Sequence, residues 1–240
     1  MTDDSLTPRA KALWELLAAA PVAFPSGPGA QVVASPGSKM CPPGWAGIVV
    51  LGDAAIATVP TEDARKPVQE ALSSIAVESL TRADVLKSVL PIQAVLGPAT
   101  LAYVSREHFV PARPGVIEQV ALDDPEVQAL LQEVSMGDAD ESGIGEITSA
   151  AFIVREEGEL AAVAGYREWP GATAHMCILT AEAARGRGLA KRAAAAAVDH
   201  ALTAGLLPQW RARPEASRRV AKALGFRQLG AQLSFHLRPE

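Results

Sequence analysis

The amino-acid sequence predicts an α/β protein built from two units. The 240-residue chain is 49% hydrophobic, which is enough apolar material for a sizeable core. In its second half, predicted strands and helices follow one another in the order α–β–β–β–α–β–α–β–β. The formal net charge of −5 makes nucleic-acid binding an unexpected function.

The composition also narrows the class of protein. Cys41 and Cys177 are far apart and form no CxxC pair, so we expect neither a disulfide framework nor a metal site. No stretch approaches the ~20 apolar residues of a membrane-spanning helix. The chain opens with Asp3 and Asp4 where a signal peptide would be basic. We therefore expect a cytoplasmic protein that binds neither membranes nor nucleic acid.

The first unit is expected to span residues 1–115. Apolar periodicity and capping residues predict helices 8–20, 62–78 and 82–90, strands 48–51, 55–59 and 99–104, and a loop rich in Pro, Gly and Ser over 21–46. This half carries no chemical motif comparable with those of the second half. We interpret it as a supporting α/β domain.

The second unit is expected to span residues 116–240. The same signals predict helices 123–135, 188–204 and 214–224, strands 151–155, 160–168, 172–180, 209–212, 226–229 and 231–237, and a polar loop over 136–148. The helix 188–204 directly follows the most informative stretch of the chain.

That stretch reads Arg185-Gly186-Arg187-Gly188-Leu189-Ala190. Two glycines let the backbone turn its N–H groups outward. The first turn of a helix adds unpaired N–H donors and the positive end of the helix dipole. With two arginines beside it, this turn predicts a cradle for a phosphate or pyrophosphate.

Two ordered motifs give the second unit a resemblance to a known family. The stretch 185–190 fits the pattern [Q/R]-x-x-G-x-[G/A] at a strand-to-helix turn, and Gly225-Phe226 follows a short helix further on. Residues 205–210 read G-x-x-P-x-W. In these features the segment 116–240 resembles the GNAT superfamily of acyl-CoA-dependent N-acetyltransferases. The resemblance implies a mixed, mostly antiparallel sheet flanked by helices, and the first half could be a degenerate copy of the same fold.

The resemblance also implies which residues hold acetyl-CoA, with no metal. Backbone N–H groups from Arg187 to Ala190 would hold the pyrophosphate, and strand 176–180 would pair with the pantetheine arm. Strand 209–212 would splay away and open a slot for the thioester. The implied cofactor-binding residues are Ile178, Leu179, Thr180, Arg185, Gly186, Arg187, Gly188, Leu189, Ala190 and Ser217.

Two positions depart from the family pattern. Pro214 stands where many relatives have an asparagine at the start of the second motif's helix. Ala221 stands where many have a tyrosine that protonates the leaving thiolate. These departures favour cofactor binding over any particular catalytic assignment. They motivate the alternative of a non-catalytic acyl-CoA sensor or interaction module.

Acetyl transfer to an amine needs a base for the amine, a polarised carbonyl and a proton for the thiolate. We select Glu141 and His175 as catalytic candidates, although a solvated loop carboxylate and a satisfied strand histidine are the structural alternatives. Cys177 is expected to be a buried strand residue and not a nucleophile. Three further candidates, more expected in structural roles, are Glu146, Glu168 and Tyr166.

The expected function is that of a transferase, moving acetyl from acetyl-CoA directly to an amine in a ternary complex. Small amines, amino-acid derivatives, aminoglycoside-like molecules and protein amines all fit as acceptors. An enzyme that uses a longer acyl-CoA is a rival hypothesis, and the sequence is also compatible with a homodimer.

Overall fold

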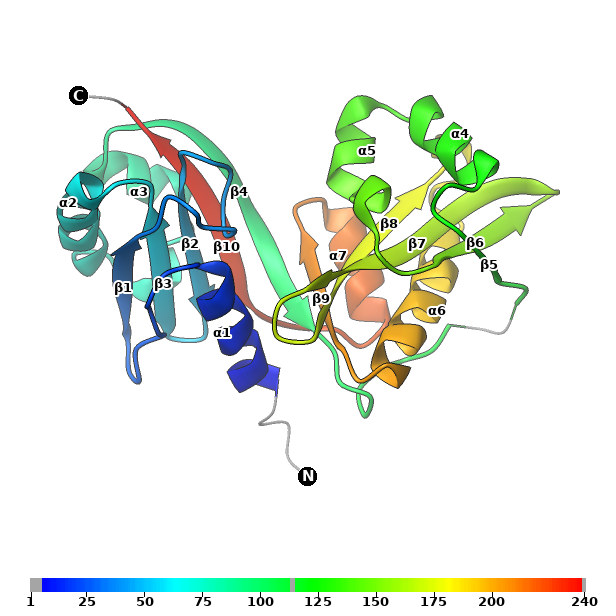
Figure 1. Ribbon diagram of the computed structural model, residues 1–240, viewed down its shortest axis with the longest axis horizontal. Coiled ribbons are helices and arrows are strands. Elements are labelled where there is room, and N and C mark those ends of the chain that lie inside the picture. The colour runs from blue at the N-terminus through cyan, green and yellow to red at the C-terminus, as the bar shows by residue number, and fades with distance from the viewer. Residues whose placement is uncertain (1–5, 113–114, 239–240) are drawn as a thin grey trace. The chain divides into compact units, whose positions relative to one another are not determined.

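The computed structural model describes residues 6–112 and 115–238 as a mixed α/β fold with mostly antiparallel strand pairing (Figure 1). This confirms the predicted fold class. The chain divides into two compact units. The first unit comprises the chain up to Ala102 together with the segment from Gln228 onward, and the second unit is Tyr103–Arg227.

The strands of the first unit follow the order β1-β3-β2-β10-β4. Its elements are α1 (Leu6–Leu17), β1 (Gly29–Ala34), β2 (Ala46–Leu51), β3 (Ala54–Val59), α2 (Glu62–Ser73), η2 (Val77–Ser79), α3 (Ala83–Val89), β4 (Ile92–Tyr103) and β10 (Arg227–Leu237). Val68 and Leu72 of α2 and Leu86 of α3 pack on strand residues in one apolar cluster. Every residue of β2 and β3 is buried, as expected for strands covered on both faces.

The first unit differs from the sequence prediction at several elements: β4 begins at Ile92 and not at residue 99, α2 ends at Ser73 and not at residue 78, and β1 and β10 also differ. Strand β1 lies within the expected loop 21–46 and pairs with β3 in parallel. Only Val32 of β1 is buried, so the strand has too little apolar pattern to be recognised without its partner. The predicted strands 226–229 and 231–237 are one strand, β10. A Cβ on Gly230 would lie 1.8 Å from the carbonyl oxygen of Val50, so this glycine permits close strand approach instead of a break.

The compact units also differ in extent from the predicted ranges 1–115 and 116–240. The main reason is β10, which pairs with β2 from Gly230↔Leu51 to Phe235↔Ala46 and so belongs to the first unit's sheet. Whether the first unit is a degenerate copy of the second stays a prediction.

The second unit has the strand order β9-β8-β7-β6-β5. Its elements are β5 (Glu118–Val120), α4 (Pro125–Glu133), α5 (Met136–Ser142), η3 (Ile144–Glu146), β6 (Ala151–Glu156), β7 (Glu159–Trp169), β8 (Thr173–Thr180), η4 (Glu182–Ala184), α6 (Leu189–Thr203), β9 (Leu207–Ala212) and α7 (Glu215–Ala223). Helices α4 and α5 lie on one side of this sheet, and α6 and α7 lie on the other (Figure 1).

Helix α5 occupies the first half of the predicted polar loop 136–148. Ser135 caps it, since its hydroxyl oxygen accepts a hydrogen bond from the backbone N–H of Asp138 at 3.1 Å. The helix is short, and Ser142 is its only buried residue. It therefore lacks the apolar stripe by which sequence reasoning finds a helix.

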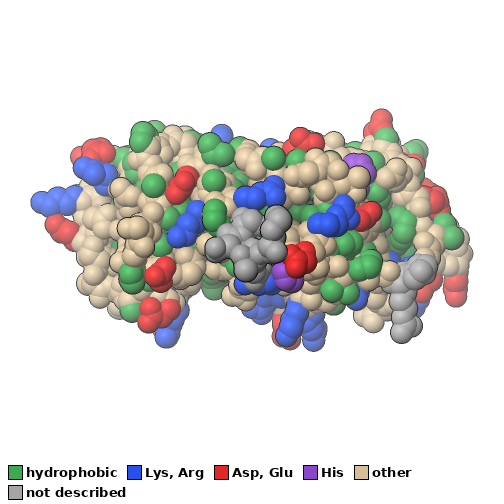
Figure 2. Space-filling view, turned by 90° about the horizontal axis from the view of Figure 1, so that it is seen from below, with side chains coloured by type: hydrophobic (Ala, Val, Ile, Leu, Met, Phe, Trp, Pro, Cys, Tyr) green, Lys and Arg blue, Asp and Glu red, His purple; other side chains and the backbone are tan. Residues whose placement is uncertain are grey.

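The surface has a mixed charge. Figure 2 shows basic and acidic side chains interspersed on the face that it presents. None of the helices within residues 6–112 and 115–238 has the length and apolar character required to cross a membrane.

Candidate functional site

The candidate site begins where two parallel strands of the second unit separate. Strand β8 pairs with β9 over only three positions, ending at His175↔Gln209. Beyond that pair, β8 continues to Thr180 along β7. A cavity of about 630 Å³ lies past the separation, with Ile178 on its β8 side and Trp210 on its β9 side.

One end of the cavity is the N-terminus of α6. Gly186 and Gly188 line it with φ angles of +81° and +79°, a left-handed conformation that favours glycine. A Cβ added at either glycine would meet nothing within 4 Å, so the space over the turn is open. Gly188 caps α6 without a side-chain hydrogen bond, and the first turn holds no acidic residue. The first N–H groups of this helix therefore face a cavity that suits an anion.

Helix α7 provides one wall of the cavity and is joined to β9 by a side-chain hydrogen bond. The Trp210 indole Nε1 donates to the Ser217 hydroxyl oxygen at 2.9 Å. Trp210 also packs edge-on against Phe226, with 5.2 Å between ring centroids. Ser217 accordingly faces the cavity with a fixed hydroxyl group.

Two of the four described cationic side chains that line the cavity already have a carboxylate partner. Arg185 pairs with Asp138 at 3.1 Å, and Arg219 pairs with Glu215 at 3.6 Å. Arg213, which follows β9, pairs with Glu141. Lys191, in the first turn of α6, lines the cavity and has no hydrogen-bond or ion-pair partner within the described ranges. Sequence reasoning missed Lys191, although its position three residues after the second glycine of the turn was a usable signal.

The structure brings most of the predicted cofactor-binding residues together around this cavity. Those that line it are Ile178, Thr180, Arg185, Gly186, Gly188, Leu189, Ala190 and Ser217. The side chains of Leu179 and Arg187 lie elsewhere. Leu179 is buried with Cys177 in a core cluster, because alternate residues of a strand face opposite sides of the sheet. Arg187 pairs with Glu156 of β6.

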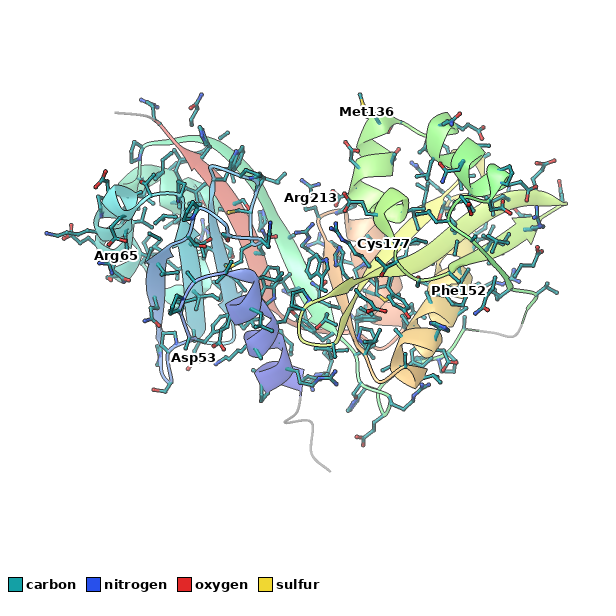
Figure 3. The ribbon with its side chains drawn as sticks, in the orientation of Figure 1. Asp53, Arg65, Met136, Phe152, Cys177 and Arg213 are labelled. Carbon is teal, nitrogen blue, oxygen red and sulfur yellow. The ribbon has the colours of Figure 1, made fainter. Side chains whose placement is uncertain are left out.

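Of the two catalytic candidates, Glu141 lines the cavity from α5. Both of its carboxylate oxygens contact Arg213, with 3.2 Å between Oε1 and the arginine Nε. Figure 3 labels Arg213, whose side chain extends toward α5. Glu141 is thus held in place by a two-point ion pair at the cavity wall.

His175 is not among the residues that line the cavity. Its ring stacks on that of Trp169, with 4.0 Å between centroids and 10° between planes. Its Nδ1 lies 2.6 Å from Oε1 of Gln209. Desolvation, with a further contribution from the charge of Arg211, lowers the pKa of His175 to about 3, although part of the residue still meets solvent. The imidazole is therefore neutral at physiological pH.

Two of the remaining candidates, Glu146 and Tyr166, have side-chain partners. Glu146 pairs with Arg167, and the Tyr166 hydroxyl lies 3.0 Å from Nδ1 of His200. Glu168 is exposed on β7. Burial raises the pKa of Cys177 to about 12, so its thiol stays protonated and poorly nucleophilic. Within the described residues, no group of three or more His, Cys, Asp or Glu side chains could hold a metal ion.

The comparisons with known proteins concern the same region. The family described as GNAT acetyltransferase matches residues 147–231. No curated protein sequence matches the chain.

Solved structures show fold likenesses of limited extent. A GNAT-family protein from Novosphingobium aromaticivorans is 24% identical, with a TM-score of 0.46 over 60% of this chain and 65% of its own. A GNAT-family acetyltransferase from Colwellia psychrerythraea is 14% identical, with a TM-score of 0.48 over 68% of this chain and 63% of its own. A GCN5-related N-acetyltransferase from Kribbella flavida is 15% identical, with a TM-score of 0.49 over 80% and 90%.

The chain thus spans less than two thirds of the first two of these structures. The family match includes β8, the 185–190 turn, β9 and α7, which together carry the two sequence motifs. The predicted resemblance of the C-terminal half to the GNAT superfamily is thereby confirmed, with residues 147–231 matching a GNAT acetyltransferase domain.

Proposed function

We propose that this protein is an N-acetyltransferase that moves an acetyl group from acetyl-CoA directly to an amine. One observation carries the proposal: the cavity between the separating strands β8 and β9 is continuous with the open N-terminus of α6. Acetyl-CoA needs both in one site: the space between the strands for its thioester, and the N–H groups at the start of α6 for its pyrophosphate. The family match over residues 147–231 supports the same reaction class.

The residues present fit acetyl-CoA. The uncapped N–H groups at the start of α6 would bind the pyrophosphate, and Lys191 would add a positive charge there. Beyond His175, β9 no longer pairs with β8, so the backbone of Ile178 and Thr180 offers a strand edge to the pantetheine amides. The pyrophosphate and the pantetheine arm of acetyl-CoA would then each contact a complementary segment of the chain.

In the proposed reaction the amine nitrogen attacks the thioester carbonyl carbon. A C–N bond forms, the C–S bond breaks, and the amine's proton must be removed while the thiolate gains one. Glu141 is the proposed base, because it is the predicted carboxylate that lines the cavity. The Ser217 hydroxyl accepts a hydrogen bond from Trp210, which leaves its own proton available to the leaving sulfur.

His175 fits a different role from the one expected. A pKa of about 3 makes its imidazole a poor base for an amine at neutral pH. We propose that it acts instead as a positioning residue, which holds Gln209 and Trp169 at the point where the strands separate.

A second candidate function is acyl-CoA binding without catalysis. Pro214 caps α7 with no side-chain hydrogen bond, and Ala221 is buried where many relatives place the tyrosine acid. Both functions require acetyl-CoA binding, and only the enzyme releases free CoA when an amine is present.

The first experiment is a thermal shift with CoA, acetyl-CoA and longer acyl-CoAs, since a ligand that binds the native state raises its apparent stability. A rise with acetyl-CoA, followed by CoA release with an amine, supports the enzyme. Binding without release across an amine panel favours the sensor. No rise with any acyl-CoA contradicts both.

A further inference from the structure

Arg211 differs from the other arginines that surround the cavity. Arg185 and Arg219 line the cavity, and both have carboxylate partners. Arg211 also lines the cavity, from β9, but has no ion pair within residues 6–112 and 115–238. Its guanidinium carbon lies 5.7 Å from the centre of the Trp169 ring. An arginine placed over an aromatic ring is ordered without its charge being neutralised.

Gln209, two residues before Arg211 on β9, carries a buried hydrogen-bond donor that has no partner in the part of the chain that the structure describes. Gln209 is fully buried, and its Nε2 has no hydrogen-bond partner among the described atoms. The Oε1 atom of the same amide is already engaged with Nδ1 of His175. A buried amide donor without a partner costs free energy. Gln209 does not line the cavity, so Arg211 is the member of this cluster that a ligand in the cavity would meet.

The charges around this cluster are otherwise balanced or absent. Arg167 lies opposite His175 on β7 and is paired with Glu146. His175 is neutral, and the Cys177 thiol is protonated. The net unpaired charge at the cluster is therefore the single positive charge of Arg211. Burial lowers the pKa of Arg211, although part of its side chain meets solvent, and the group stays protonated.

From this arrangement, and on the basis of the proposed function, we propose that Arg211 binds a carboxylate of the acceptor. The acceptor is then an amine that also carries a carboxylate, which is the chemistry of an amino acid. The planar guanidinium offers two parallel N–H donors to the two oxygens of a carboxylate. Polycationic amines fit poorly, because Arg211 repels them.

The position of Arg211 favours binding of the acceptor's carboxylate over binding of the cofactor's phosphates. The uncapped α6 turn and Lys191 form the anion-binding end of the cavity. Arg211 instead lies beside Trp169 and follows Gln209, the last β9 residue paired with β8. The thioester is expected at this separation, and the acceptor must approach it there.

The test compares amino acids with their own carboxamides as acceptors, by CoA release from acetyl-CoA. We expect kcat/KM to favour at least one amino acid over its carboxamide by tenfold or more, as a charge-assisted hydrogen-bond pair predicts. The amine of the carboxamide is less basic and is more often neutral, which by itself would make the carboxamide the faster acceptor. A preference for the amino acid would therefore not arise from amine basicity. In Arg211→Gln we expect that preference to fall to within about twofold, and in Arg211→Lys to be partly retained.

Arg65→Gln is the matched control, because Arg65 is an exposed arginine of α2 in the first unit. It should keep the parental preference. Carboxamides that react as well as amino acids, or a preference that survives in Arg211→Gln, would overturn the proposal. So would CoA release with simple monoamines but with no amino acid. Failure of the parent to bind acetyl-CoA in the thermal-shift experiment is a separate result, which overturns the proposed function itself.

Discussion

His175 Nδ1 and Gln209 Oε1 lie 2.6 Å apart, and these two residues form the last paired position between β8 and β9. The contact therefore marks the point at which the sheet of the second unit opens. On its other side the His175 ring is stacked on Trp169. A proton added to this imidazole would place a second positive charge near Arg211.

We predict acid destabilisation from this histidine. Its pKa is about 3 in the folded protein and about 6.5 when unfolded, so the unfolded state binds the extra proton between these pH values. The contribution of His175 to stability is then fully present above about pH 6.5 and is lost as the pH falls toward 3. The upper bound on the loss is roughly 5 kcal/mol, at about 1.4 kcal/mol per pKa unit. Because the residue keeps some solvent contact, we expect less.

Denaturant unfolding measured from pH 4 to pH 8 checks this prediction. The variant His175→Gln should show a flatter pH dependence than the parent over the acid half of this range. His236→Gln, which removes a histidine of β10 in the first unit, is the control. An unchanged slope in His175→Gln would contradict the assigned pKa.

The anion cradle can be tested at Gly188. Both Gly188→Ala and Gly188→Glu incur the strain of a φ of +79°, which costs about 1–2 kcal/mol per residue. Only Gly188→Glu places a negative charge in the open space over the turn. We expect acetyl-CoA affinity to fall at least tenfold further in Gly188→Glu than in Gly188→Ala. Equal affinities, measured by calorimetry, would mean that the pyrophosphate binds elsewhere.

The proposed base can be tested at Glu141. Replacing the carboxylate with an amide in Glu141→Gln should lower kcat by about 10²–10⁴-fold, the usual contribution of a general base. Acetyl-CoA binding should be retained. Glu168→Gln, at an exposed position on β7, should keep the parental kcat. Steady-state CoA release at saturating acceptor decides the matter, and a parental kcat in Glu141→Gln would remove it from the mechanism.

Alanine substitutions at two glycines can distinguish the cost of a left-handed backbone conformation from the cost of a steric clash. Gly225 and Gly205 have φ angles of +87° and +76°. A Cβ on Gly225 would lie 1.9 Å from the carbonyl oxygen of His108, whereas one on Gly205 would meet nothing within 4 Å. We expect Gly205→Ala to cost about 1 kcal/mol, and Gly225→Ala more than about 3 kcal/mol. Similar midpoints of urea unfolding for the two variants would argue against the close approach at Gly225.

The sequence predicted the parts of the site that depend on local chemistry. Gly186 and Gly188 before a helix are a local signal, and the structure places both at the open end of the cavity. The sequence also predicts strands β6 to β9 and the long helix α6 of the second unit, whereas the short strand β5 is not predicted. These features need no knowledge of distant partners.

Features created by tertiary contacts were not predictable in the same way. The short helix α5 brings Glu141 to the cavity, but its only buried residue is Ser142. Arg211 is left without a carboxylate partner because the nearby carboxylates pair with other arginines, and those pairings depend on the tertiary structure. Sequence alone also could not reveal that Gly230 sits against the Val50 backbone within a continuous strand.

Strand β10 has a consequence for the order of synthesis. It lies between β2 and β4, yet in the chain it follows every described strand of the second unit. While a ribosome is still producing the second unit, β10 has not yet been synthesised. The strand edges of β2 and β4 that later pair with β10 therefore lack their hydrogen-bond partner. The second unit, whose elements run consecutively from Tyr103 to Arg227, can fold earlier. The part of the protein made first is therefore the part completed last.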